Sequence, residues 1–438
     1  MGSRASGVGL AWALSVIFQF ISPLLGLGNA NCPASITPQF PTPYTSGGEG
    51  LMTGGGRRRL PSPASPLEND DLLSDILLRL PPAPSSLPRA SLVCKRWRSL
   101  ISDPAFLRRF RDRHRRNAPL LGFFTSVPRC LSFTPIQDPP DRLPPVRFSL
   151  NLDDGCRILG CRHGLVLLFD PTPRELVVWE PVTGYLNRLA VPPGFGHGGS
   201  AVVQNGAVVR AAGDTDGGDG HSIPFLVAVV GCDGALGFAC VYSSETGEWG
   251  NLISTACPSM YVLRISPSTM IGGSLYWLLG GSTVGILEFD LDRHCLSLIH
   301  MPLNTIRDTF LRLWVMPGEG GRLGFLQLSG NTAHLWTRKT DCDGAAQWEQ
   351  RTIDLGTLLP SAEVGFPALI LGYAEEDKVS LLANSTDICM VQLESMQFKK
   401  SFEMSKFDLH HPFASVYTEG LDTGGGQDGH ERWHNNIR

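Results

Sequence analysis

The chain has 438 residues, of which 42% are hydrophobic and 18% are charged. This length is too great for one small core and predicts two or three domains, or one large repeat fold with a smaller partner. The net charge of −4 argues against a protein that binds nucleic acid over its whole surface, although residues 89–116 are densely basic.

Glycine and proline are frequent, with 49 and 33 residues, which indicates many turns and short strands rather than long helices. The 11 cysteines are an odd number and are scattered without Cys-x-x-Cys pairs. This distribution fits reduced, buried thiols better than a disulfide framework. We therefore expect a cytoplasmic or nuclear protein.

The amino terminus points the other way. Arg4 is followed by an apolar run that ends in Gly28 and Ala30, the small-x-small pattern of a signal-peptidase site. Met52 then opens a flexible polar leader. Residues 1–51 are thus either signal-like, which gives the secretory pathway as the alternative location, or a misassigned extension; residues 52–66 are a linker. Membrane contact is expected only if residues 1–30 act as an anchor.

Helical periodicity begins at Leu67, and we expect a small three-helix domain over residues 67–116. The first stripe contains Leu72, Leu73, Ile76, Leu77 and Leu80, and Pro81-Pro82 ends it. A second stripe contains Leu92, Val93, Trp97, Leu100 and Ile101, with basic residues on the other faces. Asp103-Pro104 is typical of a cap followed by the first residue of a helix, and Phe106 and Phe110 anchor that third helix.

These segments, "LENDDLLSDILLRLPP" and "SLPRASLVCKRWRSLISDPAF", resemble the F-box of the large grass-type plant F-box family. The common Leu-Pro opening is Leu67-Glu68 in this chain. The resemblance implies docking to Skp1, or a Skp1-like adaptor, and through it to the cullin of a ubiquitin ligase. It makes the following residues candidates for the docking surface or the core behind it: Leu67, Leu72, Leu73, Ile76, Leu77, Leu80, Pro81, Leu92, Val93, Cys94, Lys95 and Trp97.

The basic residues that follow, from Arg108 to Arg116, raise the possibility of a nucleic-acid site. No set of base-stacking aromatic residues and no known binding motif accompanies them. We therefore interpret this run as a solvated helix face that leads out of the helical domain, and we expect no nucleic-acid partner.

Beyond Pro119, short β-rich runs alternate with turns. The aromatic residues Trp179, Tyr242, Phe289 and Trp336 recur at intervals of roughly 45–65 residues, the range of a four-stranded propeller blade. With a first, weaker unit over residues 121–150, about six blades fit, although a pair of open β-sheets in a sandwich is an alternative. The longest loop, residues 199–222, is a candidate contact or a disordered insertion, and its composition favours disorder.

The stretches "RHGLVLL", "VWEPVTG", "GSLYWL" and "LEFDL" resemble the propeller-like, kelch-like domain that follows the F-box in many plant members of that family. The likeness covers most of residues 121–417 and implies a domain that recognises the target protein. The fold class is thus α+β and multidomain, with residues 418–438 as a disordered tail.

No catalytic or nucleotide-binding motif occurs, so we expect a non-catalytic protein without cofactors or metals. Cys156, Cys161 and His163 lack a nearby fourth ligand for zinc. The expected function is that of a substrate-recognition adaptor of a Skp1-cullin-F-box ubiquitin ligase, or of an F-box scaffold outside a ligase. The alternative is a secreted or membrane-tethered propeller that binds a glycan or hydrolyses a small ligand, which predicts disulfides and a glycosylated Asn384.

Overall fold

The computed structural model describes residues 69–127, 130–151, 155–195, 202–210, 224–302, 310–340, 346–357, 368–383, 387–403 and 409–418. They form two compact units, a helical one up to Asp112 and a larger unit of β-strands. The signal-like segment, the linker, Leu67, the tail beyond Thr418 and the Asn384 glycosylation sequence lie outside the described residues. No helix within the described ranges is long and apolar enough to cross a bilayer.

The helical unit contains four helices among its described residues, where three were expected. They are α2 (Asp70–Leu77), α3 (Ser86–Ser91), α4 (Lys95–Ile101) and α5 (Pro104–His114). The Asn69 side chain caps α2 by accepting the backbone N–H groups of Asp71 and Leu72. The predicted cap of the last helix is confirmed, because Asp103 Oδ1 accepts the backbone N–H of Ala105 at 3.0 Å.

Helix α3 is the one that the sequence pattern missed. It lies in a stretch of prolines and serines that resembles a linker, and it has no side-chain cap. It forms because Leu87 and Ala90 are buried, and because Pro88 lies in its first turn, where a missing backbone N–H costs little. The presence of α3 also corrects the second stripe: Leu92 and Val93 lie in the turn between α3 and α4 rather than in one helix with Trp97.

The strand unit is a six-bladed β-propeller, as the spacing of aromatic residues predicted, and all its strand pairs are antiparallel. Its first three sheets, each given from the innermost strand outwards, are as follows. They are β26 (His411–Ala414), β1 (Leu120–Val127), β2 (Cys130–Pro135) and β3 (Leu150–Asn151); β4 (Arg157–Arg162), β5 (Leu165–Asp170), β6 (Glu175–Glu180) and β7 (Tyr185–Ala190); and β8 (Asn205–Arg210), β9 (Phe225–Cys232), β10 (Leu236–Ser243) and β11 (Glu248–Trp249), with β12 (Ile253–Ala256) also paired to β10.

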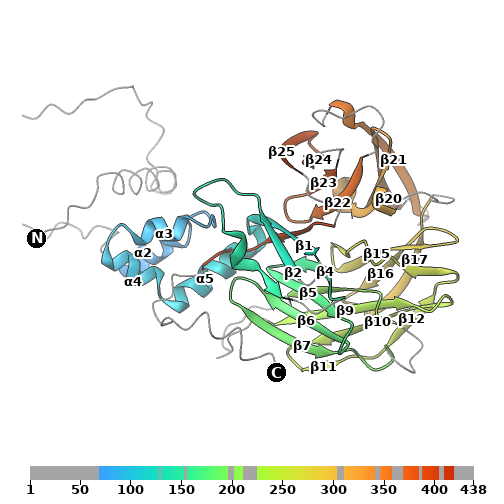
Figure 1. The fold of residues 1–438 in the computed structure, drawn as a ribbon, viewed down its shortest axis with the longest axis horizontal. Helices are drawn as coiled ribbons and strands as arrows, with labels where there is room; N and C mark the ends of the chain where they lie inside the picture. Colours follow the sequence, from blue (N-terminus) through green and yellow to red (C-terminus); the bar gives the residue numbers. More distant parts are fainter. Residues whose placement is uncertain are drawn as a thin grey trace, which may run out of the picture. The chain divides into compact units, whose positions relative to one another are not determined.

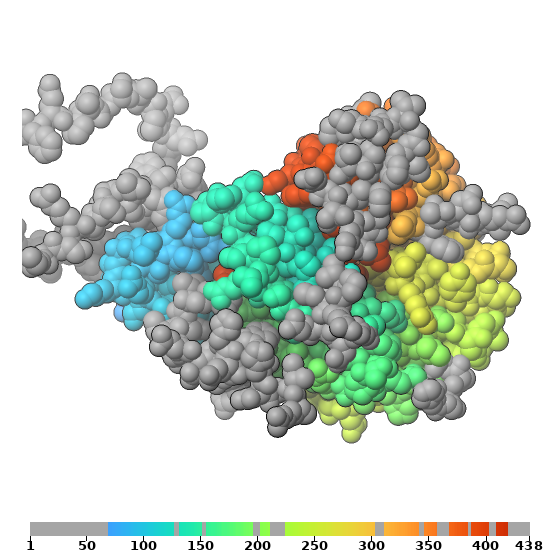
Figure 2. Space-filling view, in the orientation of Figure 1, coloured from blue at the N-terminus to red at the C-terminus, as the bar shows by residue number. Residues whose placement is uncertain are grey.

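The fourth, fifth and sixth sheets continue in chain order. They are β13 (Met260–Val262) and β14 (Thr269–Ile271), both paired to β15 (Ser274–Gly281), with β16 (Gly285–Asp290) and β17 (Cys295–His300); β18 (Leu313–Pro317), β19 (Leu323–Ser329), β20 (Thr332–Thr340) and β21 (Ala346–Asp354); and β22 (Leu369–Ala374), β23 (Val379–Ala383), β24 (Asp387–Gln392) and β25 (Gln397–Glu403). The sheets follow one another around the propeller from cyan to red (Figure 1), and the surface of the propeller has the same order of colours (Figure 2).

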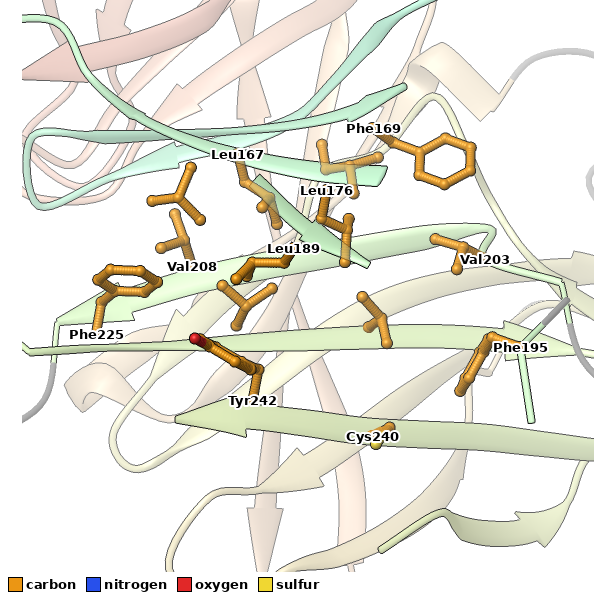
Figure 3. Close-up of a cluster of buried hydrophobic side chains, with 14 of the residues drawn as sticks. Leu167, Phe169, Leu176, Leu189, Phe195, Val203, Val208, Phe225, Cys240 and Tyr242 are labelled. Atoms are coloured by element: carbon orange, nitrogen blue, oxygen red, sulfur yellow. The ribbon is translucent and has the colours of Figure 1, made fainter. Parts of the chain in front are cut away.

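The ring is closed by the last strand, because β26 pairs with β1, the first strand of the propeller. The core consists of clusters of buried apolar side chains, and each cluster is shared by two successive sheets. Strand β5 shows why: Leu165, Leu167 and Phe169 pack toward the third sheet, while Val166 and Leu168 pack toward the first. Figure 3 shows the cluster between the second and third sheets. Strands buried on both faces therefore appear as continuous apolar runs in the sequence.

The four aromatic markers occupy equivalent positions. Trp179, Tyr242, Phe289 and Trp336 lie on β6, β10, β16 and β20, each the third strand of its sheet. The expectation of disorder over residues 199–222 was wrong for its middle part, because residues 205–210 form β8, whose first five residues are buried. Because β8 is a short apolar run between glycine-rich stretches, its sequence does not predict a strand. Packing between the neighbouring sheets stabilises it as one.

Candidate functional site

Helix α2 presents two different apolar faces. Leu73 and Leu77, one helical turn apart, are 0% and 1% exposed and form the core together with the buried Leu80. Leu72 is 49% exposed, and Ile76, one turn further on, is half-buried. Of the predicted docking residues on this helix, Leu72 and Ile76 are therefore surface candidates, while the others support them from within.

The turn between α3 and α4 carries the most exposed large apolar side chain among the described residues of the helical unit. Leu92 is 73% exposed, and Val93 beside it is half-buried. Among the remaining predicted residues, Pro81, Cys94 and Lys95 are exposed and Trp97 is half-buried. Large apolar side chains left in water on a small helical unit are typical of a surface that another protein covers.

The charges around these residues are partly paired within the unit. Arg96 binds Asp70 at 2.7 Å, which ties α4 to the start of α2, and Arg109 binds Asp75 at 3.3 Å. Arg96 is therefore not a free cation at the rim, whereas Lys95 and Arg98 are exposed. Exposed pairs of this kind contribute little to stability, so they mainly orient the helices.

The propeller contains a cluster of charged and polar groups at the point where its second, fourth and sixth sheets approach one another. Arg162, at the end of β4 in the second sheet, makes a two-pronged ion pair with Glu375, which follows β22 in the sixth sheet; the two nitrogen–oxygen distances are 2.6 and 2.8 Å. Arg162 Nη2 also donates to the backbone oxygen of Ser268 in the fourth sheet, at 3.1 Å. Glu375 in turn accepts the backbone N–H of Met270 at 3.0 Å.

This cluster joins the second, fourth and sixth sheets. Burial acts to lower the pKa of Arg162, but the charge and hydrogen bonds of Glu375 together with the charge of Glu376 oppose it, and the pKa lies above its ordinary value. A small pocket of about 30 Å³ adjoins the pair, and its lining includes Tyr373, His410 and His411. Arg162 lies in the "RHGLVLL" stretch, the one sequence signal that could have pointed to this cluster.

Two histidines near the cluster are held neutral. Burial and the neighbouring His410 lower the pKa of His411 to about 3. Burial, followed by the charges of Arg162, Arg115 and Arg210, lowers the pKa of His163 to about 3, and the His163 Nδ1 atom accepts the backbone N–H of Arg210. Each imidazole therefore stays uncharged in the folded protein at neutral pH.

This neutrality predicts acid sensitivity. Between pH 6.5 and 3 the unfolded chain binds a proton at His411 and the folded protein does not, so stability is full above pH 6.5 and falls with decreasing pH, by up to about 1.4 kcal/mol per pH unit. Urea unfolding followed from pH 7 to pH 5 should show a shallower loss in His411→Asn than in the parent. His294→Asn, at an exposed position, should leave the slope unchanged; an unaltered slope in both variants would contradict the assignment.

The groups considered for zinc are not gathered into a metal site. Within the described ranges, no three or more His, Cys, Asp or Glu side chains are arranged to hold a metal ion. Burial raises the pKa of the Cys161 thiol well above its ordinary value, which keeps it protonated and a poor metal ligand.

Comparison with known proteins identifies a family match for the helical unit. Residues 70–113 match the F-box-like family. A curated F-box/kelch-repeat protein of Arabidopsis thaliana is 31% identical over 52% of this chain and 55% of its own length, and an F-box protein of the same plant is 25% identical over 53% and 60%. The matched part of the chain thus spans little more than half the length of these relatives.

Solved structures with similarity include the WD40 domain of SCAP from fission yeast, at 13% identity over 57% of this chain and 52% of that chain, with a TM-score of 0.33. The Dos1 propeller shows 11% identity over 65% and 68%, with a TM-score of 0.36. The propeller assignment rests on the sheet order of this chain. The fold defines a protein of two units, an F-box-like unit and a propeller. The chain carries an F-box-like unit at residues 70–113 followed by a β-propeller, and it is similar to F-box proteins of Arabidopsis thaliana.

Proposed function

We propose that the protein is a substrate-recognition adaptor of a ubiquitin ligase, in which the F-box docks to Skp1 and the propeller holds the target protein. The observation that carries the proposal is the exposed apolar set on the F-box: Leu72, Leu92 and the half-buried Ile76, Val93 and Trp97. The helical unit matches the F-box-like family, and Skp1 is the partner to which an F-box docks, so Skp1 is the partner that we propose for these side chains.

The energetics favour such docking. Burying one fully exposed large apolar side chain contributes about 1.5–3 kcal/mol; Leu72 and Leu92 are 49% and 73% exposed, so covering both contributes about 2–4 kcal/mol. Lys95 and Arg98 at its rim suit an acidic partner surface and would raise the association rate more than the affinity.

The proposed mechanism is proximity. Through Skp1 and the cullin, the adaptor brings target lysines beside ubiquitin carried by another subunit, which raises their effective concentration. The protein itself makes and breaks no bonds. A role in this ligase places it in the cytoplasm or nucleus.

The test is binding of the full chain to purified Skp1 by calorimetry. Leu92→Asp should weaken binding at least about tenfold, because it puts a charge where an apolar side chain must be covered. This exposed position is a better choice than Leu77, where a charge would unfold the core. Leu236→Asp, on a leucine of the propeller that is also exposed, is the matched control and should bind like the parent. Absence of Skp1 binding by the folded parent protein would refute the proposal.

A further inference from the structure

The propeller has a groove of about 230 Å³ between its third and fourth sheets. It arises where the outer edge of the third sheet is interrupted. Ala239 pairs with Ile253 and Tyr242 with Trp249, so three residues, 250–252, lie opposite two, 240–241. One extra residue in an edge strand bends it and redirects side chains, as bulges near binding sites do. The outer strands β7, β17 and β21 have no such interruption in their pairing, whereas β25 of the sixth sheet has one extra residue between Phe398 and Lys400.

The walls of the groove are apolar and incompletely covered. Its half-buried apolar side chains are Leu226, Val241, Trp249, Ile253 and Leu291. The indole N–H of Trp249 donates to the backbone oxygen of Ala190 at 3.1 Å, which fixes the ring at the groove. Cys240 Sγ donates to the backbone oxygen of Gly250 at 3.2 Å, which holds the bulge in place. The groove is therefore preformed rather than a gap between mobile segments.

The mouth of the groove carries polar side chains that have no side-chain partner among the described residues. The carboxylate of Glu248 and the amide of Asn251 are exposed and make no side-chain hydrogen bond or ion pair with the described residues. Two further carboxylates are exposed: Glu245, three residues before Glu248, and Asp292, next to the lining residue Leu291. In the adjoining turn, Arg293 is paired with Asp290 at 3.8 Å, and His294 lines the groove. The mouth is thus acidic, with hydrogen-bonding groups available to an occupant.

The size of the groove selects the kind of occupant. Pockets for complete small-molecule ligands usually measure about 300–1,000 Å³, so a groove of about 230 Å³ suits one large side chain better. An apolar wall with an acidic mouth matches a large apolar side chain that has a basic residue next to it.

We propose that the groove between the third and fourth sheets binds a short peptide segment of the target protein, which inserts one large apolar side chain and pairs an adjacent lysine or arginine with Glu248. This inference deepens the proposed adaptor function and rests on it. It assigns target recognition to the flank of the propeller, at the bulge of the third sheet.

The test uses the full chain as bait for a phage-displayed library of random dodecapeptides. Enriched peptides should share a large apolar residue with lysine or arginine beside it. A fluorescein-labelled enriched peptide should bind Glu248→Lys at least about tenfold more weakly than the parent, a loss equivalent to about 1.4 kcal/mol. Asn251→Trp, which places a bulky side chain at the mouth, should abolish binding. Glu319→Lys, an exposed charge reversal on the fifth sheet, should have no effect.

Several outcomes would overturn the inference: no enriched peptide, peptides without a basic residue, or equal binding to the parent, Glu248→Lys and Asn251→Trp. A dimer of the parent that Asn251→Trp dissociates in sedimentation would assign the groove to a second copy instead. Skp1 binding measured on the same variants separates the two proposals. Peptide binding without Skp1 binding would refute the adaptor function alone, whereas Skp1 binding without groove-dependent peptide binding would refute the groove alone.

Discussion

Replacing Arg162 with methionine is expected to lower the free energy of unfolding of the propeller by about 3–5 kcal/mol, the usual cost of removing one member of a buried ion pair. The Arg162 side chain is 5% exposed and that of Glu375 is 21% exposed, so the carboxylate left behind has little access to water. The same change removes the hydrogen bond from Arg162 to the backbone of Ser268, so the second sheet loses this link to the fourth sheet as well as its ion pair with the sixth.

Urea unfolding followed by tryptophan fluorescence measures this loss. The matched control is Arg188→Met, which breaks a pair with Glu175 at 3.2 Å whose side chains are 43% and 31% exposed; its cost should stay below about 1 kcal/mol. Adding Glu375→Gln to Arg162→Met should restore part of the stability, because no unpaired buried charge then remains. Equal small losses for Arg162→Met and Arg188→Met would show that the buried pair does not hold the blades together.

The closing strand should be equally sensitive. Phe413 on β26 is 1% exposed and packs against Phe124, Phe133 and Phe148 of the first blade, with ring centroids 5.1, 6.3 and 5.9 Å away. Phe413→Ala is expected to cost about 3–5 kcal/mol, because it removes a large buried ring and leaves a cavity. The loss falls on the pairing of β26 with β1, the contact that closes the ring.

Thermal unfolding by calorimetry tests this expectation. Phe398→Ala on β25 is the matched control, since Phe398 is 40% exposed and its removal creates no cavity. The melting temperature of Phe413→Ala should fall by several degrees, while that of Phe398→Ala should change little. Similar melting temperatures for both variants would mean that closure by β26 contributes little to the stability of the propeller.

On the F-box surface, the sequence predicts which residues share a helix but not which of them are exposed. Periodicity grouped Leu72, Leu73, Ile76 and Leu77 on one helix, but a stripe cannot tell the face that packs inward from the face beside it. Burial separates them: Leu73 and Leu77 are core, and Leu72 is exposed. Leu92 became the prominent exposed residue because α3 ends in a turn there, and α3 itself forms only against the core of the unit.

The sequence by itself determined the two units and indicated about six blades, because apolar periodicity and the recurrence of Trp179, Tyr242, Phe289 and Trp336 are local properties of the chain; the closed ring and its exact blade count came from the tertiary structure. Only the tertiary structure decided the two sites of the propeller. Arg162 and Glu375 are 213 residues apart and meet because the ring closes, and no local pattern encodes that meeting. The groove depends on one extra residue in an edge strand, whose effect appears only when that strand pairs with β10 and a neighbouring blade packs beside it. Strand β8 likewise owes its order to the sheets on both sides, since burial between them compensates for the weak strand propensity of its own residues.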